Sequence, residues 1–459
     1  MEYSIVSMIN FELFFIAIFV LIIQLFLYYR KLGIKLLLHP GTYFGFIWLT
    51  AVISQLILEL SGIKFLTPFP EFVNEMNVLV IFTGICFIFI IFLTPNYFRF
   101  NHKIKILFIN KSLYKIVSYL TLFGATFKLV YTWYMLGVAW NLAEIRVAYA
   151  AKRGYFNDTV SLFSLLSYMN FFYTVISIIA GYCIGLLFQF KRAPIRSRWL
   201  LSIPFVVTII YTLTIGGRNP LAYGIKLYLF GFALSLVPQT VRILSRKLII
   251  YIILGVFSFF LFTTYVAEQR DEVAGNISFS QYLDNTYLKP FSGIIQYMNA
   301  HYWGYQLRRF DSFDPNNLGY GKYTFYGILN FRVPFSNALF GTDISILDFF
   351  SDLSYNKLDY FALQADGREG YYTTRSVYLE MICDYGQIGI FVFILVFVFL
   401  TNYLYILIEK RRLISVISIL PLFFVFSYWS SSNFQSVFAT NVYGPIISFF
   451  VYDFLNKKV

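Results

Sequence analysis

The apolar run Phe11-Glu-Leu-Phe-Phe-Ile-Ala-Ile-Phe-Val-Leu-Ile-Ile-Gln-Leu-Phe-Leu-Tyr-Tyr29 decides the fold class of this chain. Its length matches the roughly 20 residues that an α-helix needs to cross the hydrocarbon core of a bilayer. Arg30 and Lys31 follow without the small-residue cleavage site of a signal peptide, so we expect the run to stay in the membrane. The chain has 59% hydrophobic and 13% charged residues, which indicates a multi-span membrane protein and excludes a soluble core.

Further apolar runs predict about eleven transmembrane helices in an all-α bundle. The expected limits are 10–29, 41–60, 76–93, 114–136, 161–189, 199–216, 220–237, 248–266, 385–408, 414–430 and 438–455. About half of the 36 Lys and Arg residues lie in alternate connections and at the C-terminus, and the positive-inside rule assigns these segments to the cytoplasm. This topology predicts a cytoplasmic C-terminus and an external N-terminus.

One long polar, tyrosine-rich stretch, 267–375, interrupts the pattern between the eighth and ninth expected spans. In the predicted topology it lies outside the cytoplasm, and its apolar residues are spaced as in short helices. We therefore expect three parts: an N-terminal bundle of about eight spans (1–266), a large external loop subdomain of short helices (267–375), and about three C-terminal spans (376–459).

Charge and cysteine content give no support for a nucleic-acid partner, a disulfide framework or a metal site. The net charge of +13 mostly reflects the predicted cytoplasmic loops, so it does not indicate a nucleic-acid partner. Cys86, Cys183 and Cys383 lie far apart in apolar surroundings, a pattern that supports neither a disulfide framework nor a metal site.

A glycine-arginine turn between the sixth and seventh expected spans is a candidate anion site. The sequence Gly216-Gly217-Arg218-Asn219-Pro220 offers Asn219 as an N-cap and Pro220 as the first helical residue, so free backbone N–H groups would face outward. Such a helix N-terminus beside an arginine suits a phosphate. The alternative is a tight turn whose arginine reaches into the lipid headgroups.

Arg146 and Arg153 form a second basic group, between the fourth and fifth expected spans. They are seven residues apart, so they lie on one face if this connection is helical. Two cations on one face could bind a pyrophosphate, and the alternative is an interfacial helix that rests on anionic lipids.

A third group of charges lies where the polar stretch returns to the membrane, in Gly370-Tyr-Tyr-Thr-Thr-Arg375-Ser-Val-Tyr-Leu-Glu380-Met-Ile-Cys-Asp384-Tyr-Gly386. Glu380 and Asp384 are four residues apart and face the same way on a helix. Carboxylates at the start of a span are costly unless paired or solvated, so they either hold arginines in place or act as a general base. His301 is another candidate base, although a single loop histidine is usually a neutral structural residue.

Together these features resemble the Wzy-type O-antigen and oligosaccharide repeat-unit polymerases. The resemblance covers roughly residues 140–400: an arginine-bearing loop, a Gly-Gly-Arg turn, a large late external loop, and Arg375 followed by Asp384-Tyr-Gly386-Gln-Ile-Gly389. It implies a membrane glycosyltransferase that joins undecaprenyl-pyrophosphate-linked repeat units into a surface polysaccharide, either O-antigen of lipopolysaccharide or capsule. It also implies the external face of the bacterial cytoplasmic (inner) membrane and no cofactor.

The resemblance gives the candidate residues their roles. Pyrophosphate binding falls to Arg146, Arg153, Gly217, Arg218, Asn219 and Arg375. The acceptor hydroxyl needs a base, for which Glu380, Asp384 and His301 are candidates. Sugars would stack on Tyr302, Trp303, Tyr371 and Tyr372, although these rings are equally compatible with packing the loop onto its own core.

Two other functions remain open from the sequence. A lipid-linked oligosaccharide flippase would also need many spans and arginines for pyrophosphate, and an O-antigen ligase would have a similar external loop but another acceptor. The expected partners are the undecaprenyl-pyrophosphate-linked donor and acceptor, membrane lipids, a chain-length regulator and a flippase.

Overall fold

The computed structural model describes most of the expected bundle. The described residues are 10–61, 69–96, 110–137, 141–151, 170–191, 195, 197–215, 219–235, 302–306, 313–316, 318–321, 362–363, 369–370 and 376–410, with single positions between 250 and 309. They are helical apart from turns and one antiparallel pair of two-residue strands, β1 (Ala362–Leu363) and β2 (Glu369–Gly370).

Six helices within the described residues are long and apolar enough to cross a membrane. They are Phe11–Leu32, Pro40–Leu60, Pro70–Leu93, Lys111–Leu136, Phe172–Phe190 and Val377–Tyr403, and Arg198–Thr214 is a shorter apolar helix. The predicted class, a helical membrane protein, is therefore confirmed. The count of about eleven spans stays a prediction, because the runs 414–430 and 438–455 lie outside the described residues, as does most of 248–266.

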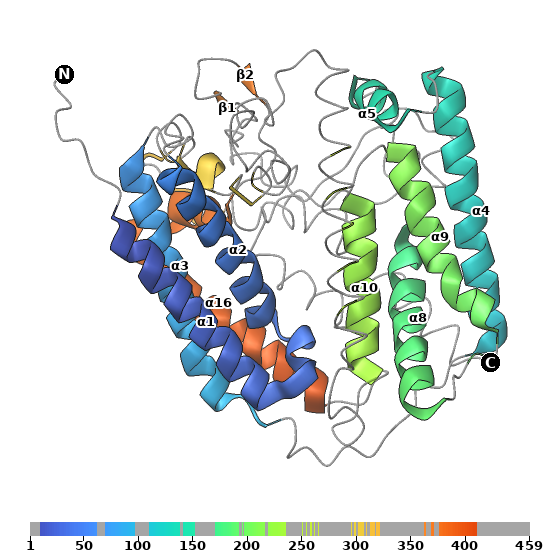
Figure 1. The fold of residues 1–459 in the computed structure, drawn as a ribbon, viewed down its shortest axis with the longest axis horizontal. Coiled ribbons are helices and arrows are strands. Elements are labelled where there is room, and N and C mark those ends of the chain that lie inside the picture. Colours follow the sequence, from blue (N-terminus) through green and yellow to red (C-terminus); the bar gives the residue numbers. More distant parts are fainter. Residues whose placement is uncertain are drawn as a thin grey trace. The chain divides into compact units, whose positions relative to one another are not determined.

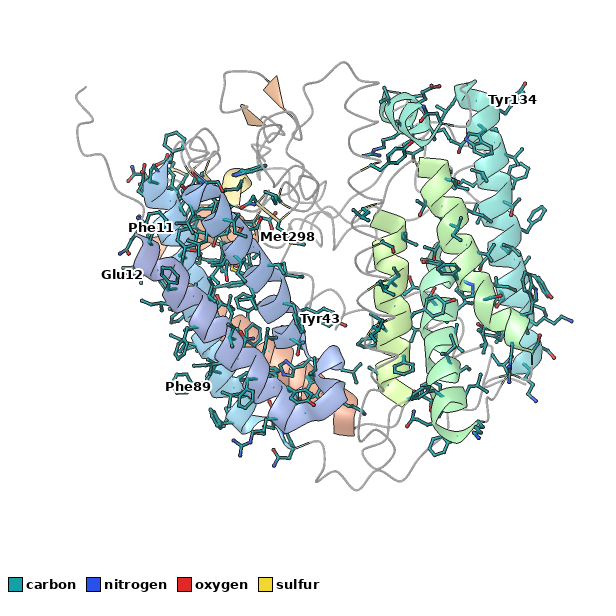
Figure 2. All side chains as sticks on the ribbon, in the orientation of Figure 1. Phe11, Glu12, Tyr43, Phe89, Tyr134 and Met298 are labelled. Carbon is teal, nitrogen blue, oxygen red and sulfur yellow. The ribbon has the colours of Figure 1, made fainter. Side chains whose placement is uncertain are left out.

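Large apolar side chains point outward from these helices, as expected for surfaces that meet lipid. Phe89 and Tyr134 are 69% and 82% exposed, and Figure 2 shows both projecting away from the helices of their own bundles. In water such a surface would be unfavourable, but it matches the hydrocarbon interior of a bilayer.

The chain forms two compact units. Unit 1 comprises Met1–Phe100, Tyr297–Arg411 and Ile419–Tyr443, and unit 2 comprises Asn101–Gln296, Arg412–Ser418 and Gly444–Val459. These units are groups of residues that pack together, whereas the predicted parts are two sets of membrane spans and one external loop. The predicted division at residues 266 and 375 therefore stays a prediction.

Unit 1 contains α1 (Phe11–Leu32), the 3₁₀ helix η1 (Gly33–Leu38), α2 (Pro40–Leu60), α3 (Pro70–Leu93) and α16 (Val377–Lys410). In it α1 packs against α2 and α3, and α16 packs against α3 (Figure 1). Local sequence sets the helix starts: Asn10 Oδ1 accepts the Glu12 N–H at the start of α1, and Pro40 and Pro70 open α2 and α3.

Unit 2 contains α4 (Lys111–Leu136), α5 (Leu142–Ala151), α8 (Asn170–Phe190), α9 (Arg198–Ile215) and α10 (Asn219–Ser235). In it α8 packs along α10, and α4 packs against α9 (Figure 1). A Cβ atom at Gly181 of α8 would overlap the Tyr228 carbonyl, and one at Gly231 of α10 would overlap the Ile178 carbonyl. Small residues therefore let these two backbones touch, as they do in many membrane helix pairs.

Candidate functional site

Two buried carboxylates lie near the start of α16. The helix begins after Ser376, whose Oγ accepts the Tyr378 N–H at 3.2 Å and whose carbonyl accepts the Leu379 N–H at 3.0 Å. Glu380 and Asp384 are fully buried on one face of the helix, as their spacing predicts. Asp384 lies about 10 Å along the axis from the first helical residue, so both carboxylates are close to one end of the span.

The helix is broken directly after these carboxylates. Gly386 has φ 71° and ψ −176°, a conformation outside the helical region that interrupts α16. A break removes the N–H donors that would serve the carbonyls one turn earlier, and inside a membrane those carbonyls need other partners. Sequence reasoning did not predict this break.

A turn from a distant part of the chain supplies the missing donors. The Gly319 N–H donates to the Cys383 carbonyl at 2.9 Å, and the Tyr320 N–H donates to the Asp384 carbonyl at 3.1 Å. We call residues 313–316 and 318–321 the docking turn. Leu318 lies against the break, since a Cβ atom at Gly386 would be 3.4 Å from its Cδ1.

An ion pair ties the same segment to α3. The Arg309 Nε donates to Glu75 Oε2 at 3.3 Å, and its guanidinium lies 3.8 Å from the ring centroid of Phe313, the first residue of the docking turn. Arg309 is only 7% exposed, and Glu75 is 26% exposed. Burial raises the pKa of the neighbouring Tyr305 well above its usual range, so this hydroxyl keeps its proton. The pair was not predicted, although a glutamate near the start of an apolar helix is a signal for it.

Polar side chains before the docking turn also enter the helix bundle of unit 1. The Tyr302 hydroxyl donates to Asn77 Oδ1 of α3 at 2.6 Å. The Asn299 amide donates to Ser54 Oγ of α2 at 2.6 Å. These buried hydrogen bonds attach the segment to α2 and α3.

Two of the predicted sugar-binding rings lie in this interior. Tyr302 is fully buried and Trp303 is 3% exposed. A sugar could stack on either ring only after neighbouring residues moved. In this conformation both rings pack inside the protein. Their role in sugar binding stays a prediction.

Arg146 lies in unit 2, on α5, and is partly buried. The connection is helical over Leu142–Ala151, and this helix packs onto the end of α4 through Ile145 and Leu136. Because α5 also packs against α9, it lies at the end of unit 2 where α9 ends and α10 begins (Figure 1). α10 begins at Asn219, one residue before the predicted start, and the Asn219 side chain is not described. The fold thus places Arg146 at the end of unit 2 where α9 ends at Ile215 and α10 begins at Asn219.

The other predicted site residues lie outside the described part of the chain. They are Arg153, Gly217, Arg218, His301, Tyr371, Tyr372 and Arg375. Among the described residues, no group of three or more His, Cys, Asp or Glu side chains gathers to hold a metal ion.

Unit 2 contains a buried lysine that was not among the predicted site residues. Lys128 lies within α4 and is 5% exposed, with its Nζ 5.5 Å from the ring centroid of Tyr211 on α9. A lysine inside a membrane-length apolar run is itself a signal of function, because an ammonium group there is costly.

Comparisons with models of protein families, with curated proteins and with solved structures find no match to this chain.

Proposed function

We propose that this protein is a polymerase that joins polyprenyl-pyrophosphate-linked oligosaccharide repeat units into a surface polysaccharide at the external face of the bacterial cytoplasmic membrane. The observation that carries the proposal is the pair of fully buried carboxylates directly before the break in α16, closed by the docking turn. Ionisable groups inside membrane helices, and irregular backbone at membrane depth, are both features of functional sites.

The carboxylates suit the acceptor half of this reaction. Joining two repeat units forms a glycosidic bond at the donor sugar, breaks its bond to the pyrophosphate, and takes a proton from the acceptor hydroxyl. A general base must lie within hydrogen-bond reach of that hydroxyl. Glu380 and Asp384 are our candidates, with His301 as a further one. The break at Gly386 interrupts α16 directly after both carboxylates, and discontinuous membrane helices often form substrate sites.

Cations suit the donor half. The leaving pyrophosphate gains negative charge in the transition state, and preorganised arginines and backbone N–H groups stabilise such charge. We assign this role to Arg146, Arg153, Arg218 and Arg375, with the backbone of Gly217 and Asn219 at the start of α10. Arg146 belongs to unit 2 and the carboxylates belong to unit 1.

The test is the length distribution of the polymer on a gel, in cells that carry single variants of equal expression. Losing a general base typically costs about 10²–10⁴ in rate, so Glu380→Gln or Asp384→Asn should leave only unpolymerised units. Arg146→Ala should shorten the chains, because a charge-assisted phosphate contact contributes about 1.5–3 kcal/mol. Glu12→Gln, at an exposed position on α1, is the matched control and should leave chain length unchanged. Normal chains from the double variant Glu380→Gln/Asp384→Asn would refute the proposal.

A flippase for lipid-linked oligosaccharides is the second candidate, and the broken helix favours it specifically. Discontinuous helices that carry buried polar groups also form the substrate sites of many transporters. Cells without the protein separate the two functions. Single repeat units displayed outside the cell indicate a missing polymerase, whereas units trapped on the cytoplasmic side indicate a missing flippase.

A further inference from the structure

Tyr320 of the docking turn carries an exposed aromatic ring beside the start of α16. Its side chain is 82% exposed, and its backbone N–H donates to the Asp384 carbonyl at 3.1 Å. This hydrogen bond holds Tyr320 against a residue that carries one of the candidate bases. The ninth expected span begins at residue 385, so the predicted topology places Tyr320 at the outer edge of the membrane. Its ring can therefore contact a ligand that approaches the carboxylates from outside.

The backbone of Tyr320 has a conformation that a bulky residue rarely adopts. Its φ is 50°, in the left-handed region where glycine, asparagine or aspartate is less strained. Lys191 is the other non-glycine residue with a positive φ in the described part of the chain, and it directly follows α8, where such residues commonly end a helix. Tyr320 lies instead in a turn between Gly319 and Gly321. Strained residues of this kind cluster at functional sites.

The docking turn also presents polar groups that suit a ligand rich in hydroxyl groups. Asp314 and Asn316 are exposed, and the Asp314 carboxylate accepts the Asn316 N–H at 2.9 Å, which orders this part of the turn. Carboxylate and amide oxygens accept hydrogen bonds from hydroxyl groups, while a tyrosine ring offers an apolar face. A saccharide has hydroxyl groups at its edges and apolar C–H groups on its faces, so it matches both features.

A lipid headgroup is the rival ligand, and the charge of the turn disfavours it. Asp314 is the only charged residue in the sequence from 313 to 321, whereas an anionic lipid surface attracts lysine and arginine. An aromatic membrane anchor also needs no unusual backbone. Tyr134 is equally exposed, at 82%, and lies in the last turn of the regular helix α4.

We propose that Tyr320 is a stacking platform for the acceptor saccharide and positions this sugar beside α16 at Asp384. The choice of the acceptor, rather than the donor, rests on the proposed function, because the acceptor hydroxyl must reach the general base. Binding of a saccharide at Tyr320 does not itself require polymerisation. Tyr320 is a binding residue, and the proton transfer remains with the carboxylates.

The test is calorimetric binding of the oligosaccharide repeat unit to the purified full-length protein in phosphatidylcholine nanodiscs. The repeat unit is released by mild acid from lipid extracts of cells that lack the protein. Tyr320→Asn removes the ring but suits the left-handed backbone, and it should weaken binding about three- to tenfold. Tyr320→Phe keeps the ring and should bind like the wild type. Tyr134→Asn, at an equally exposed position, is the matched control and should also leave binding unchanged.

Thermal unfolding separates binding by the ring from support of the fold. Asparagine adopts a left-handed φ with less strain than tyrosine, so Tyr320→Asn should unfold at the same temperature as the wild type or at a higher one. A lower unfolding temperature together with weaker binding would show that the ring supports the turn, and it would overturn the platform.

Further outcomes identify the ligand and separate it from the proposed polymerase. Undecaprenyl diphosphate without a sugar should bind Tyr320→Asn and the wild type alike, and equal weakening of both ligands would show that the ring contacts lipid. No binding of the repeat unit by the wild type, or wild-type binding by Tyr320→Asn, would overturn the platform. Weaker binding by Tyr320→Asn together with normal polymer in cells that lack the protein would support the saccharide site and contradict the proposed polymerase.

Discussion

Gly386 is the residue on which the geometry of the broken helix depends. Its φ of 71° with ψ near 180° belongs to a region that is essentially restricted to glycine. Replacement by alanine would add this backbone strain and bring a methyl group against Leu318. The alanine must either accept the strain or straighten the helix and release the docking turn.

We expect Gly386→Ala to lower the free energy of unfolding by about 1–3 kcal/mol, the cost of a side chain in such a conformation. Unfolding in detergent, followed by circular dichroism, measures the loss. Gly137→Ala is the control, because Gly137 also has a positive φ (62°) but lies in the milder left-handed helical region, with open space around a Cβ atom. Equal losses for the two variants would contradict the special role of the break.

His39 lies between η1 and α2 as a buried, neutral N-cap. Its Nδ1 accepts the Gly41 N–H at 3.0 Å, so the ring proton is on Nε2, which lies 3.2 Å from Asn402 Oδ1. Burial lowers the pKa of His39 to about 3, although the hydrogen bond to Asn402 opposes the shift. A proton on Nδ1 would also face the Gly41 N–H.

This shift predicts a loss of stability in acid. An unfolded histidine has a pKa of about 6.5, so between pH 6.5 and 3 the unfolded chain binds one proton more than the folded one. Stability should therefore fall as pH decreases through this range, by about 2 kcal/mol at pH 5 relative to pH 7. The measurement compares unfolding of the wild type with His39→Asn, which keeps an N-cap acceptor but cannot titrate. An identical pH dependence in both proteins would show that His39 is not the group responsible.

At the scale of elements, the docking turn is held by contacts of two kinds. Its backbone N–H groups bind the carbonyls at the break of α16, while Arg309 next to it pairs with Glu75 of α3. Removing one partner of a buried ion pair leaves the other uncompensated and weakens the attachment.

We expect Arg309→Met to release the docking turn more often and so to expose Cys383, whose carbonyl accepts the Gly319 N–H and whose side chain is buried. The measurement is the rate of maleimide labelling of Cys383 in a Cys86→Ser/Cys183→Ser background, which should rise by about tenfold or more. Arg30→Met, at an exposed position on α1, is the matched control. Unchanged labelling in Arg309→Met would show that the ion pair does not hold the turn.

The pair of α8 and α10 should be sensitive to single methyl groups. Gly181→Ala and Gly231→Ala each place a Cβ atom against backbone of the neighbouring helix, which cannot move aside as a side chain can. We expect each to cost about 1–3 kcal/mol by overpacking, despite the higher helix propensity of alanine. Gly84→Ala of α3, whose nearest neighbour is the Val20 side chain, is the control and should cost less in the same unfolding measurement.

At the scale of the whole molecule, hydropathy predicts the spans because each is a local property of about 20 residues. The helices α1, α2, α3 and α4 begin and end within a few residues of their predicted limits, apart from the earlier start of α3 at Pro70. The common face of Glu380 and Asp384 was also predictable, since it follows from helix geometry.

The rest of the candidate site depends on contacts between distant residues. Gly319 and Cys383, or Glu75 and Arg309, are far apart in the sequence, and nothing in either segment alone specifies its partner. Gly386 alone did not indicate a broken helix. The break also needs donors for the carbonyls of Cys383 and Asp384, and these donors come from the distant residues Gly319 and Tyr320. The burial of Tyr302 and Trp303 has the same cause, because aromatic rings suit both a sugar platform and a core.

The predicted topology of the whole chain is testable by labelling from one side of the membrane. Asn316 is an exposed residue of the docking turn, and Arg30 is an exposed residue at the far end of α1. In intact cells with permeabilised outer membranes, a membrane-impermeant maleimide should label Asn316→Cys and not Arg30→Cys, both in a background without native cysteines. The reverse pattern would invert the topology and remove the basis for chemistry outside the cytoplasm.

The two hydrogen bonds that join the docking turn to α16 are made by main-chain atoms, and this affects how the protein can evolve. Every amino acid except proline supplies the same N–H at positions 319 and 320, although the positive φ of Tyr320 favours glycine, asparagine or aspartate there. These hydrogen bonds can therefore be kept while the amino acids at positions 319 and 320 change during evolution. Selection on these hydrogen bonds would show itself mainly as an absence of proline at these two positions and a lasting glycine at 386.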